Sequence, residues 1–436
     1  MSKPKTGGSA DVRSGSPGDL GSRRGIAAAC IGNATEWYDF AIFGSLATVI
    51  GLVFFPSGNL TTALTAGFAA YGTALLVRPL GAILIGRLGD QRGRRSVLVL
   101  VIFLMAGATA AVAVLPGYAT IGLLAPIGLM LLRAVQGLAA GGELGVAAVF
   151  ILESAPDSRR GWAGGLHIAT MALGIATGMA VAVTLFVFFG DDDLDSGWWR
   201  IAFLLALPLG LIGAYLRRRV AETTHFQEVD AGSAIVDRPV RLLWKQHRAA
   251  LTRGFCLIAA GSLAFNIFFI FMPNNLAARH GASLAPTLAG TAVALGVAAA
   301  AAVVLGRLSD RIGRRPVTIT STAALVVLAI PMSLVATRGS LLALLLAQLT
   351  VGVVVAGVLS MAMVGELFHS TLRSTGLGLT VGLATAVVGG TAPWLSQIMV
   401  VKLDAQALPG CYVALVALLA LIALRKWPES AFAGLS

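Results

Sequence analysis

Twelve long apolar runs constrain the fold of this chain more than any other feature of its sequence. A helix needs about 20 predominantly apolar residues to cross the hydrocarbon core of a bilayer. Short segments that contain Gly, Pro or charged residues separate the runs, for example PSGN (56–59) and DDDLDSG (191–197). We therefore expect an all-α membrane protein with twelve transmembrane helices. The expected spans are residues 25–52, 61–86, 96–115, 121–150, 163–189, 199–216, 252–273, 284–306, 316–336, 340–366, 374–399 and 405–424.

The composition supports a membrane protein and argues against several other classes. Only 12% of the 436 residues are charged, and the mean hydropathy is +0.85, whereas soluble domains carry roughly 25% charged residues. The sequence has no HExxH, GxSxG or phosphate-loop motif, and its three cysteines lie in apolar runs without metal-ligand spacing. We therefore expect neither enzyme activity nor a metal site or cofactor.

Basic residues are concentrated in alternate loops. The net charge of +12 is compatible with nucleic-acid binding, but the Lys and Arg residues follow the positive-inside pattern of a membrane protein. If the N-terminus is cytoplasmic, the outer loops hold only Arg200, Arg279, Arg338 and Lys402. High Ala and Gly content, with Arg far above Lys, is typical of a GC-rich bacterium. We expect a multi-pass protein of a bacterial cytoplasmic membrane, with both termini inside and no nucleic-acid partner.

Two charged loops are nearly identical. GRLGDQRGRRS (86–96) follows the second expected span, and GRLSDRIGRRP (306–316) follows the eighth. A Glu and an Arg seven positions apart also follow both the fourth and the tenth spans. The repeats indicate two parallel six-helix halves. The expected division is a disordered cytoplasmic tail (1–24), an N-terminal half (25–216), a cytoplasmic linker (217–249), a C-terminal half (250–425) and a second cytoplasmic tail (426–436).

The repeated loops suggest a device that holds the two halves together. Asp90 and Asp310 fall at helix C-termini, where the helix dipole disfavours an anion. Each carboxylate therefore needs an Arg or the N-terminus of another helix. The alternative is that both loops only fix the topology. The candidate gating residues are Gly86, Asp90, Gly93, Arg94, Glu153, Arg160, Gly306, Asp310, Gly313, Arg314, Glu366 and Arg373.

These loops resemble the signature loop of the major facilitator superfamily. The blocks GNATEWYDFAIFG (32–44), LLVRPLGAILIGRLGD (75–90) and GWWRIAFLLALPLG (197–210) further resemble the metabolite:proton symporter family. The resemblance implies a secondary active transporter that imports small organic acids or zwitterions with protons by alternating access. Spans one, two and four look closest to α-ketoglutarate and citrate members, whereas residues 206–227 look closer to proline/betaine members.

Ionisable residues inside the membrane are costly and mark candidate functional positions. Arg133 lies near the middle of the fourth span, and we expect it to hold a substrate carboxylate with help from Gln136. The alternative is a structural ion pair with Asp39 or Glu36. Other candidates for substrate contact are Arg78, His167, Trp37 and Asn266. The competing interpretation is packing or gating for Arg78 and packing for Trp37. For His167 it is an interior histidine with its hydrogen bonds satisfied.

Three carboxylates are candidates for proton coupling. Asp39 and Glu36 share one face of the first span with Asn33, Phe40 and Phe43. Asp39 is the preferred proton carrier because it lies deeper in the span. Glu143 in GGELG is a further candidate, with a structural pairing to a cytoplasmic Arg as its alternative.

The sequence therefore predicts a proton-coupled symporter for a small organic acid such as a di- or tricarboxylate or an α-keto acid. The alternative is a proton symporter for zwitterionic osmolytes such as proline or glycine betaine, which need an Arg for the carboxylate and aromatic rings for the cationic nitrogen. The expected partners are the substrate, protons and lipid, and we expect the monomer to be functional.

Overall fold

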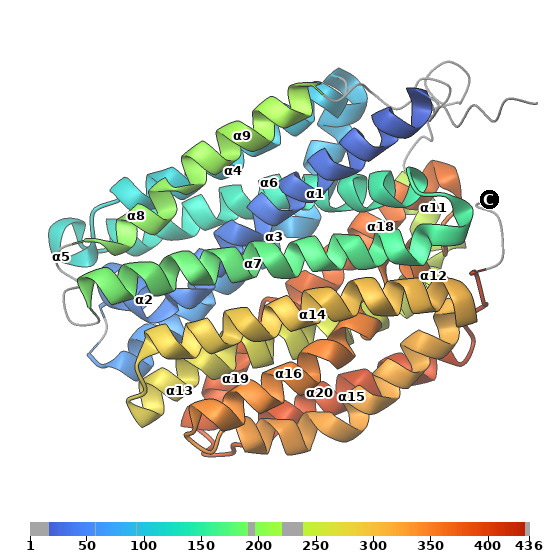
Figure 1. Ribbon diagram of the computed structural model, residues 1–436. Coiled ribbons are helices and arrows are strands. Elements are labelled where there is room, and N and C mark those ends of the chain that lie inside the picture. The colour runs from blue at the N-terminus through green and yellow to red at the C-terminus, as the bar shows by residue number, and fades with distance from the viewer. Residues whose placement is uncertain (1–16, 57, 93, 191–196, 220–238, 432–436) are drawn as a thin grey trace, which may run out of the picture.

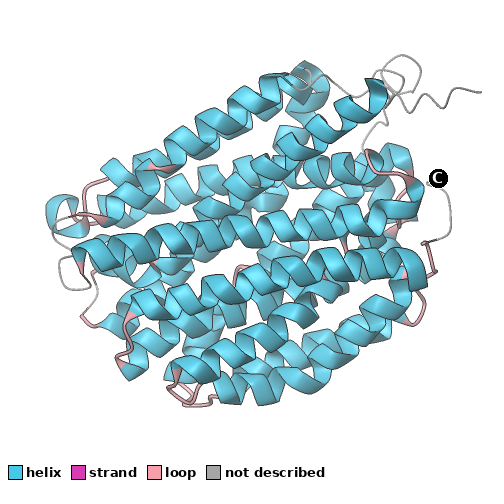
Figure 2. Cartoon of the chain, viewed as in Figure 1, coloured by secondary structure: helices cyan, strands magenta, loops and turns pink. Residues whose placement is uncertain are grey.

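The computed structural model describes residues 17–56, 58–92, 94–190, 197–219 and 239–431. Every regular element within these residues is a helix, and the helices run side by side in one bundle (Figures 1 and 2). The first 16 residues of the expected N-terminal tail and most of the expected linker lie outside the described residues. The bundle confirms the predicted all-α membrane fold.

The N-terminal half contributes the helices drawn from blue to green in Figure 1. They are α1 (Pro17–Ser45), α2 (Ala47–Phe54), α3 (Leu60–Arg92), α4 (Arg94–Val114), α5 (Tyr118–Ile121), α6 (Leu124–Glu153), the 3₁₀ turn η1 (Asp157–Arg159), α7 (Arg160–Phe189), α8 (Trp199–Leu204) and α9 (Ala206–Arg219).

The C-terminal half follows a short helix, α11 (Pro239–Gln246), which lies within the expected linker. Its elements are α12 (Arg248–Phe265), the π-helix η2 (Asn266–Phe271), α13 (Met272–His280), α14 (Leu284–Ile312), α15 (Arg314–Ala336), α16 (Leu341–Val358), α17 (Met361–Gly365), α18 (Ser370–Ala384), the π-helix η3 (Thr385–Gly389), α19 (Ala392–Val401) and α20 (Leu408–Leu424).

Twelve membrane spans can be assigned within the described residues. Eight helical stretches are long and apolar enough to cross a bilayer, and one bent pair of helices passes the same test. Three shorter apolar helices, Leu100–Val114, Trp199–Gly213 and Leu408–Leu424, complete the set. The count agrees with the sequence, although several spans begin or end a few residues away from the expected positions.

The first span, expected over residues 25–52, is bent. Its two parts, Ala29–Ser45 and Ala47–Phe54, meet at an angle of 64°. α2 packs backbone against backbone on α3, because a Cβ at Gly51 would lie 1.8 Å from the carbonyl oxygen of Ala63. Such an approach is possible only for glycine.

The seventh and eleventh spans contain π-helices, which hydropathy did not reveal. η2 interrupts the seventh span, and η3 interrupts the eleventh. At the end of η3, Gly390 N donates to the carbonyl oxygen of Thr385, five residues earlier in the chain, at 2.6 Å. A π-helix inserts an extra residue into the turn and is frequently found at functional sites.

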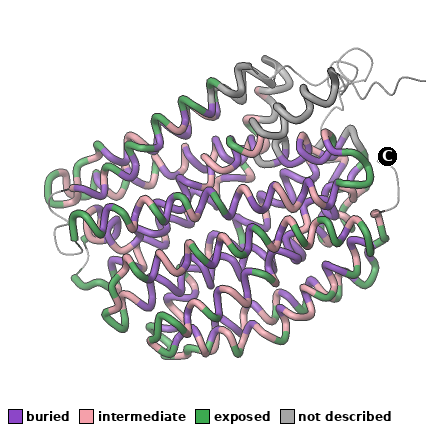
Figure 3. The backbone as a smooth tube through the Cα atoms, viewed as in Figure 1, coloured by how far each residue is buried: buried purple, intermediate pink, exposed green. Residues whose placement is uncertain are grey.

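Whether a residue is buried depends on whether it points into the bundle. Figure 3 shows buried residues along the inward faces and exposed residues towards the loops. Large apolar side chains such as Val187 (70% exposed) and Leu131 (63% exposed) cover the outside, as expected for a surface that faces lipid. α7 and α14, one from each half, lie side by side (Figure 1).

Candidate functional site

Buried charges of the N-terminal half gather where α1, α3 and α6 meet. Arg78 on α3 donates from Nη2 to Oε1 of Glu36 on α1 at 3.0 Å, and both side chains are buried. The Arg78 guanidinium also lies over the rings of Trp37 at 5.1 Å and Phe40 at 4.3 Å. Breaking such a buried pair leaves an uncompensated charge. These contacts are compatible with packing, and the role of Arg78 in packing, gating or substrate contact stays a prediction.

Arg133 on α6 occupies an aromatic pocket. Its guanidinium lies 4.0 Å from the ring centroid of Phe43 and 5.2 Å from that of Phe40. It donates to Oε1 of Gln136 at 2.8 Å and to the carbonyl oxygen of Tyr71 at 3.4 Å. Its partners are therefore neutral oxygens and ring faces. A buried cation held in this way is ready to accept a carboxylate.

Asp39 is linked to Arg133 through two other side chains. Thr109 on α4 donates to Oδ2 of Asp39, and Gln136 donates from Nε2 to the Thr109 hydroxyl at 2.7 Å. Because Gln136 also accepts from Arg133, a chain of hydrogen bonds joins the carboxylate to the guanidinium. The structure thus shows this indirect connection in place of the direct ion pair that was the alternative for Arg133.

A cavity of about 30 Å³ lies between α1, α4, α6 and α9. Its wall includes all three predicted proton-coupling residues, Glu36, Asp39 and Glu143. Oδ1 of Asp39 has no hydrogen-bond partner in the described residues. A volume of this size suffices for a water molecule, which would supply that missing partner.

A polar contact beside this network joins the two halves. The Tyr71 hydroxyl on α3 donates to Oδ1 of Asn266 at 3.0 Å. Asn266 is the first residue of η2, and its Nδ2 donates to the carbonyl oxygen of Ser262. Gln348 on α16 donates to the carbonyl oxygen of Phe268 within the same π-helix at 3.0 Å. Tyr71 therefore contacts Arg133 through its carbonyl and η2 through its hydroxyl.

Trp37 and His167 lie beside this network. Trp37 packs against Arg78 and is half-buried. His167 is buried in α7, and its carbonyl oxygen accepts from Nδ2 of Asn33 at 3.0 Å. Nδ1 of His167 has no partner in the described residues. Within the described residues, no hydrogen bond joins His167 to Arg133 or Asp39.

Sequence reasoning missed Thr109 and Tyr71. Thr109 lies inside an apolar run, and threonines in helices usually bond to a carbonyl oxygen of their own helix; the Met105 carbonyl oxygen indeed lies 2.9 Å from the Thr109 hydroxyl. Tyr71 contributes a carbonyl oxygen as well as its ring, and no sequence pattern signals that. For Thr109 the sequence did offer one signal, because it is a polar residue inside the third expected span.

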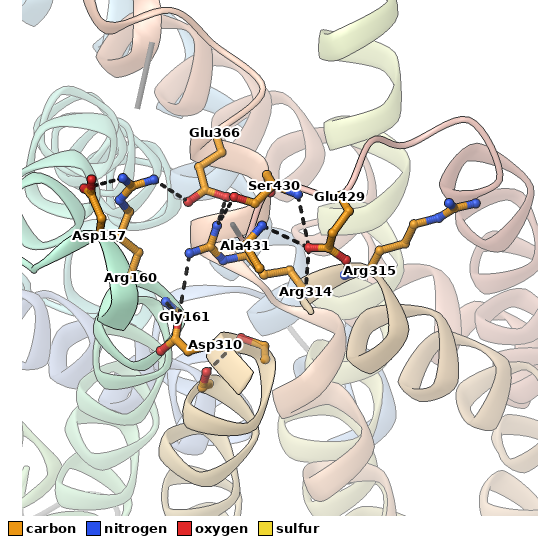
Figure 4. Close-up of polar contacts among 12 residues, drawn as sticks. Asp157, Arg160, Gly161, Asp310, Arg314, Arg315, Glu366, Glu429, Ser430 and Ala431 are labelled. Atoms are coloured by element: carbon orange, nitrogen blue, oxygen red, sulfur yellow. Dashed lines mark hydrogen bonds and ion pairs between the residues drawn. The ribbon is translucent and has the colours of Figure 1, made fainter. Parts of the chain in front are cut away.

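A set of ion pairs and caps closes the arginine-rich end of the bundle, where α7, α15 and α18 begin (Figure 4). Asp310 accepts from Gly161 N at 2.7 Å and from Trp162 N at 2.8 Å, at the start of α7. This is the arrangement that the helix-dipole argument anticipated, a carboxylate at one helix end held by the N-terminus of another.

The Glu and Arg pairs of the two repeats are exchanged. Arg160 of the N-terminal half bonds to Glu366 of the C-terminal half at 3.3 Å, and Arg373 bonds to Glu153 at 2.8 Å. Arg314 also bonds to Glu366. Burial raises the pKa of Glu366, and the two guanidinium groups oppose that shift. We call these links the latch: Glu153, Arg160, Asp310, Arg314, Glu366 and Arg373.

The other predicted gating residues divide into two groups. Gly306 packs against Gly161, since a Cβ at Gly306 would lie 2.4 Å from the Gly161 carbonyl oxygen, and Gly313 has φ +105°. The first copy of the loop, Gly86, Asp90, Gly93 and Arg94, lies outside the residues that the structure describes in atomic detail.

Comparisons with known proteins agree with this architecture. The profile of the Major Facilitator Superfamily matches residues 29–393. The ectoine/proline transporter ProP of Corynebacterium glutamicum is 34% identical over 94% of this chain and 84% of its own length. The proline/betaine transporter of Salmonella typhimurium is 32% identical over the same shares.

A solved structure shows the same fold. The proton:xylose symporter XylE bound to 6-bromo-6-deoxy-D-glucose superposes with a TM-score of 0.76 at 17% identity, covering 94% of this chain and 96% of that chain. Family and fold together exclude an enzyme. The chain therefore belongs to the Major Facilitator Superfamily, and it is a multi-pass membrane transporter.

Proposed function

We propose that the protein imports a small zwitterion of the proline, betaine or ectoine kind together with protons. The relatives are named for substrates of this class. They favour the second of the two substrate classes that the sequence left open, and a di- or tricarboxylate finds no support among them. The observation that carries the proposal is Arg133, a buried guanidinium set against aromatic rings and bonded to neutral oxygens.

Each end of a zwitterion has a matching group at this site. The substrate carboxylate would take the Arg133 donors that Gln136 and the Tyr71 carbonyl now occupy. The cationic nitrogen would lie on an aromatic face, for which Tyr71 and Trp37 are available, and Asn266 would contribute from the opposite half. A quaternary nitrogen prefers such ring faces, whereas a second carboxylate would be repelled by them.

Proton coupling follows from the hydrogen-bond chain. When a substrate carboxylate draws Arg133 away from Gln136, the bond from Gln136 to Thr109 loses its orientation, and so does the bond from Thr109 to Asp39. Asp39 is therefore our proton carrier, with Glu36 and Glu143 lining the same cavity. Arg78 with Glu36 holds Phe40 in place beside Arg133.

The remaining features complete the proposal. The arginine-rich end faces the cytoplasm, by the positive-inside rule, so the latch closes the inner side of a bacterial cytoplasmic membrane. Both termini are then cytoplasmic. The proposed site lies within one chain, and the monomer is the transporting unit.

The test is uptake into proteoliposomes under an inward proton gradient. Labelled proline, glycine betaine, ectoine, α-ketoglutarate and citrate are offered separately, to the parent protein and to Arg133→Ala. Arg338→Ala, at an exposed position in a loop, is the matched control. We expect accumulation of at least one zwitterion that a protonophore abolishes, with loss in Arg133→Ala only. Uptake of α-ketoglutarate or citrate without uptake of any zwitterion would overturn the substrate class.

A further inference from the structure

The residues that follow the last span lie against the start of α15 (Figure 4). α20 ends at Leu424, and Trp427, which is 2% exposed, anchors the chain that follows it on the bundle. We call residues 425–431 the C-terminal segment. Its backbone is also held by Arg315, which donates from Nη2 to the carbonyl oxygen of Arg425 at 2.9 Å. The sequence predicted only a tail here.

α15 has no cap of its own. Its N-cap residue is Gly313, which has no side chain, and Pro316 in the first turn has no backbone N–H. The N–H groups of Arg314 and Arg315 are therefore left to find acceptors elsewhere. Both donate to Glu429, from Arg314 N to Oε1 at 3.0 Å and from Arg315 N to Oε2 at 3.1 Å. The carboxylate of a different element thus caps this helix.

The carboxylate is also fixed within its own segment. Oε1 of Glu429 accepts from Ser430 N at 3.1 Å and from Ala431 N at 3.0 Å. Partial burial acts to raise the pKa of Glu429, but the backbone N–H groups outweigh it and hold the pKa below its ordinary value. A Cβ at Gly313 would lie 2.7 Å from Oε2. Glycine at this position therefore leaves room for the carboxylate.

The capped residue Arg314 belongs to the latch. Its Nη1 bonds to Glu366 and donates to the carbonyl oxygen of Ser430 at 3.2 Å. Glu366 in turn bonds to Arg160 of the other half. One continuous set of contacts runs from the C-terminal segment through Arg314 and Glu366 across the boundary between the halves.

We propose that Glu429 is a positioning residue of the latch, which holds Arg314 on Glu366 by capping α15 and so favours the state closed at the arginine-rich end. The inference rests on the proposed function only in that the halves alternate between two states. In the described structure the hydrogen bonds of Glu429 all go to residues of its own half, so its effect on the latch passes through Arg314.

The test measures how often the arginine-rich end opens. Cys30, Cys256 and Cys411 are replaced by Ala, and Ser309→Cys is introduced, because Ser309 is 5% exposed and lies against Gly161 of α7. The rate at which a maleimide modifies this cysteine, in proteoliposomes without substrate, reports the open fraction. Glu429→Ala should raise that rate about fivefold, the effect of losing one helix cap.

Two reference variants bracket the result. Lys426→Gln changes an exposed residue of the same segment whose side chain makes no hydrogen bond or ion pair in the described structure, and it should leave the rate unchanged. Asp310→Asn weakens a direct link to α7 and should raise the rate further. If Glu429→Ala does not fold, Glu429→Gln replaces it, with an expected rise of about twofold because one acceptor oxygen remains.

A rate in the Glu429 variant equal to that of Lys426→Gln would overturn the proposal. The measurement needs no substrate, so its outcome is independent of which cargo the protein carries. Failure of zwitterion uptake with a faster cysteine reaction would refute the proposed substrate and leave the role of Glu429 intact. An unchanged cysteine reaction with normal zwitterion uptake would refute the role of Glu429 and leave the proposed substrate intact.

Discussion

The two halves share a fold but divide the buried polar groups unequally. Within the described residues, the charged side chains buried midway along spans, such as Asp39, Arg78 and Arg133, all belong to the N-terminal half. Buried Arg314 and Arg373 of the C-terminal half lie at helix ends. That half instead carries the two π-helices and buried amides such as Asn266 and Gln348.

This difference suggests a division of labour. Charge at membrane depth is retained where it binds ions or protons, and π-helices mark places where the backbone hydrogen-bond pattern is locally altered. The N-terminal half would then bind the carboxylate and the proton, while the C-terminal half would change shape around them. The contact between Tyr71 and Asn266 is where the two functions meet. Variants in each half should therefore fail in different ways.

Asp39→Asn should give the largest effect. An amide cannot carry the proton, so we expect uptake against a gradient to fall at least about 100-fold, the scale of removing a proton-transfer group. Exchange of labelled for unlabelled substrate should persist, because it needs no net proton movement. Asp404→Asn, in a loop, is the control. Proton-driven uptake by Asp39→Asn would contradict the assignment of the carrier.

Arg133→Ala should weaken substrate binding in both assays. Losing a charge-assisted hydrogen bond costs about 1.5–3 kcal/mol, so KM for uptake and for exchange should rise about 10- to 100-fold together. Arg133→Lys should recover part of the loss, since it restores the charge but not the planar pair of donors. An unchanged KM in Arg133→Ala would leave this residue structural and direct attention to Arg78.

Gln348→Leu tests the C-terminal half. The substitution removes the donor to the Phe268 carbonyl in η2 and keeps a similar volume. An unsatisfied buried group costs about 1–3 kcal/mol, so we expect kcat for uptake and exchange to fall about tenfold, with KM unchanged. A loss of proton-driven uptake with normal exchange would mean that the C-terminal half takes part in proton coupling. The contrast between the two halves would then disappear.

The parts of the fold that followed from the sequence are those that depend on the pattern of apolar and charged residues along the chain. Apolar length and basic loops were enough for twelve spans, and the spacing of Asp310 at a helix end was enough to anticipate its bond to α7. The 64° bend and the π-helices were not foreseen, because hydropathy does not report how closely backbones approach or where a turn gains a residue.

For the site, the sequence identified residues but not the contacts between them. Buried charge marked Asp39, Glu36, Arg78 and Arg133, but their partners depend on how each helix is rotated about its axis, which the sequence does not give. Glu36 therefore bonds to Arg78, and Asp39 reaches Arg133 only through Thr109 and Gln136. The exchanged pairing of the latch could likewise be known only once α17 lay beside α7 and α18 beside α6.

The pH dependence of the C-terminal segment gives the smallest effect. The folded pKa of Glu429 lies below its ordinary value, so its stabilising effect is complete above the unfolded pKa of about 4.3 and is lost as the pH falls through the lower folded value. The thermal midpoint of the parent protein should exceed that of Glu429→Gln by about 2 °C at pH 7. Because the carboxylate stays charged, this difference should be the same at pH 6 and should shrink only below the ordinary pKa.

Lys426→Gln should match the parent at every pH. A difference that disappears between pH 7 and pH 6 would mean that another group, such as Glu366 with its raised pKa, governs this end of the molecule.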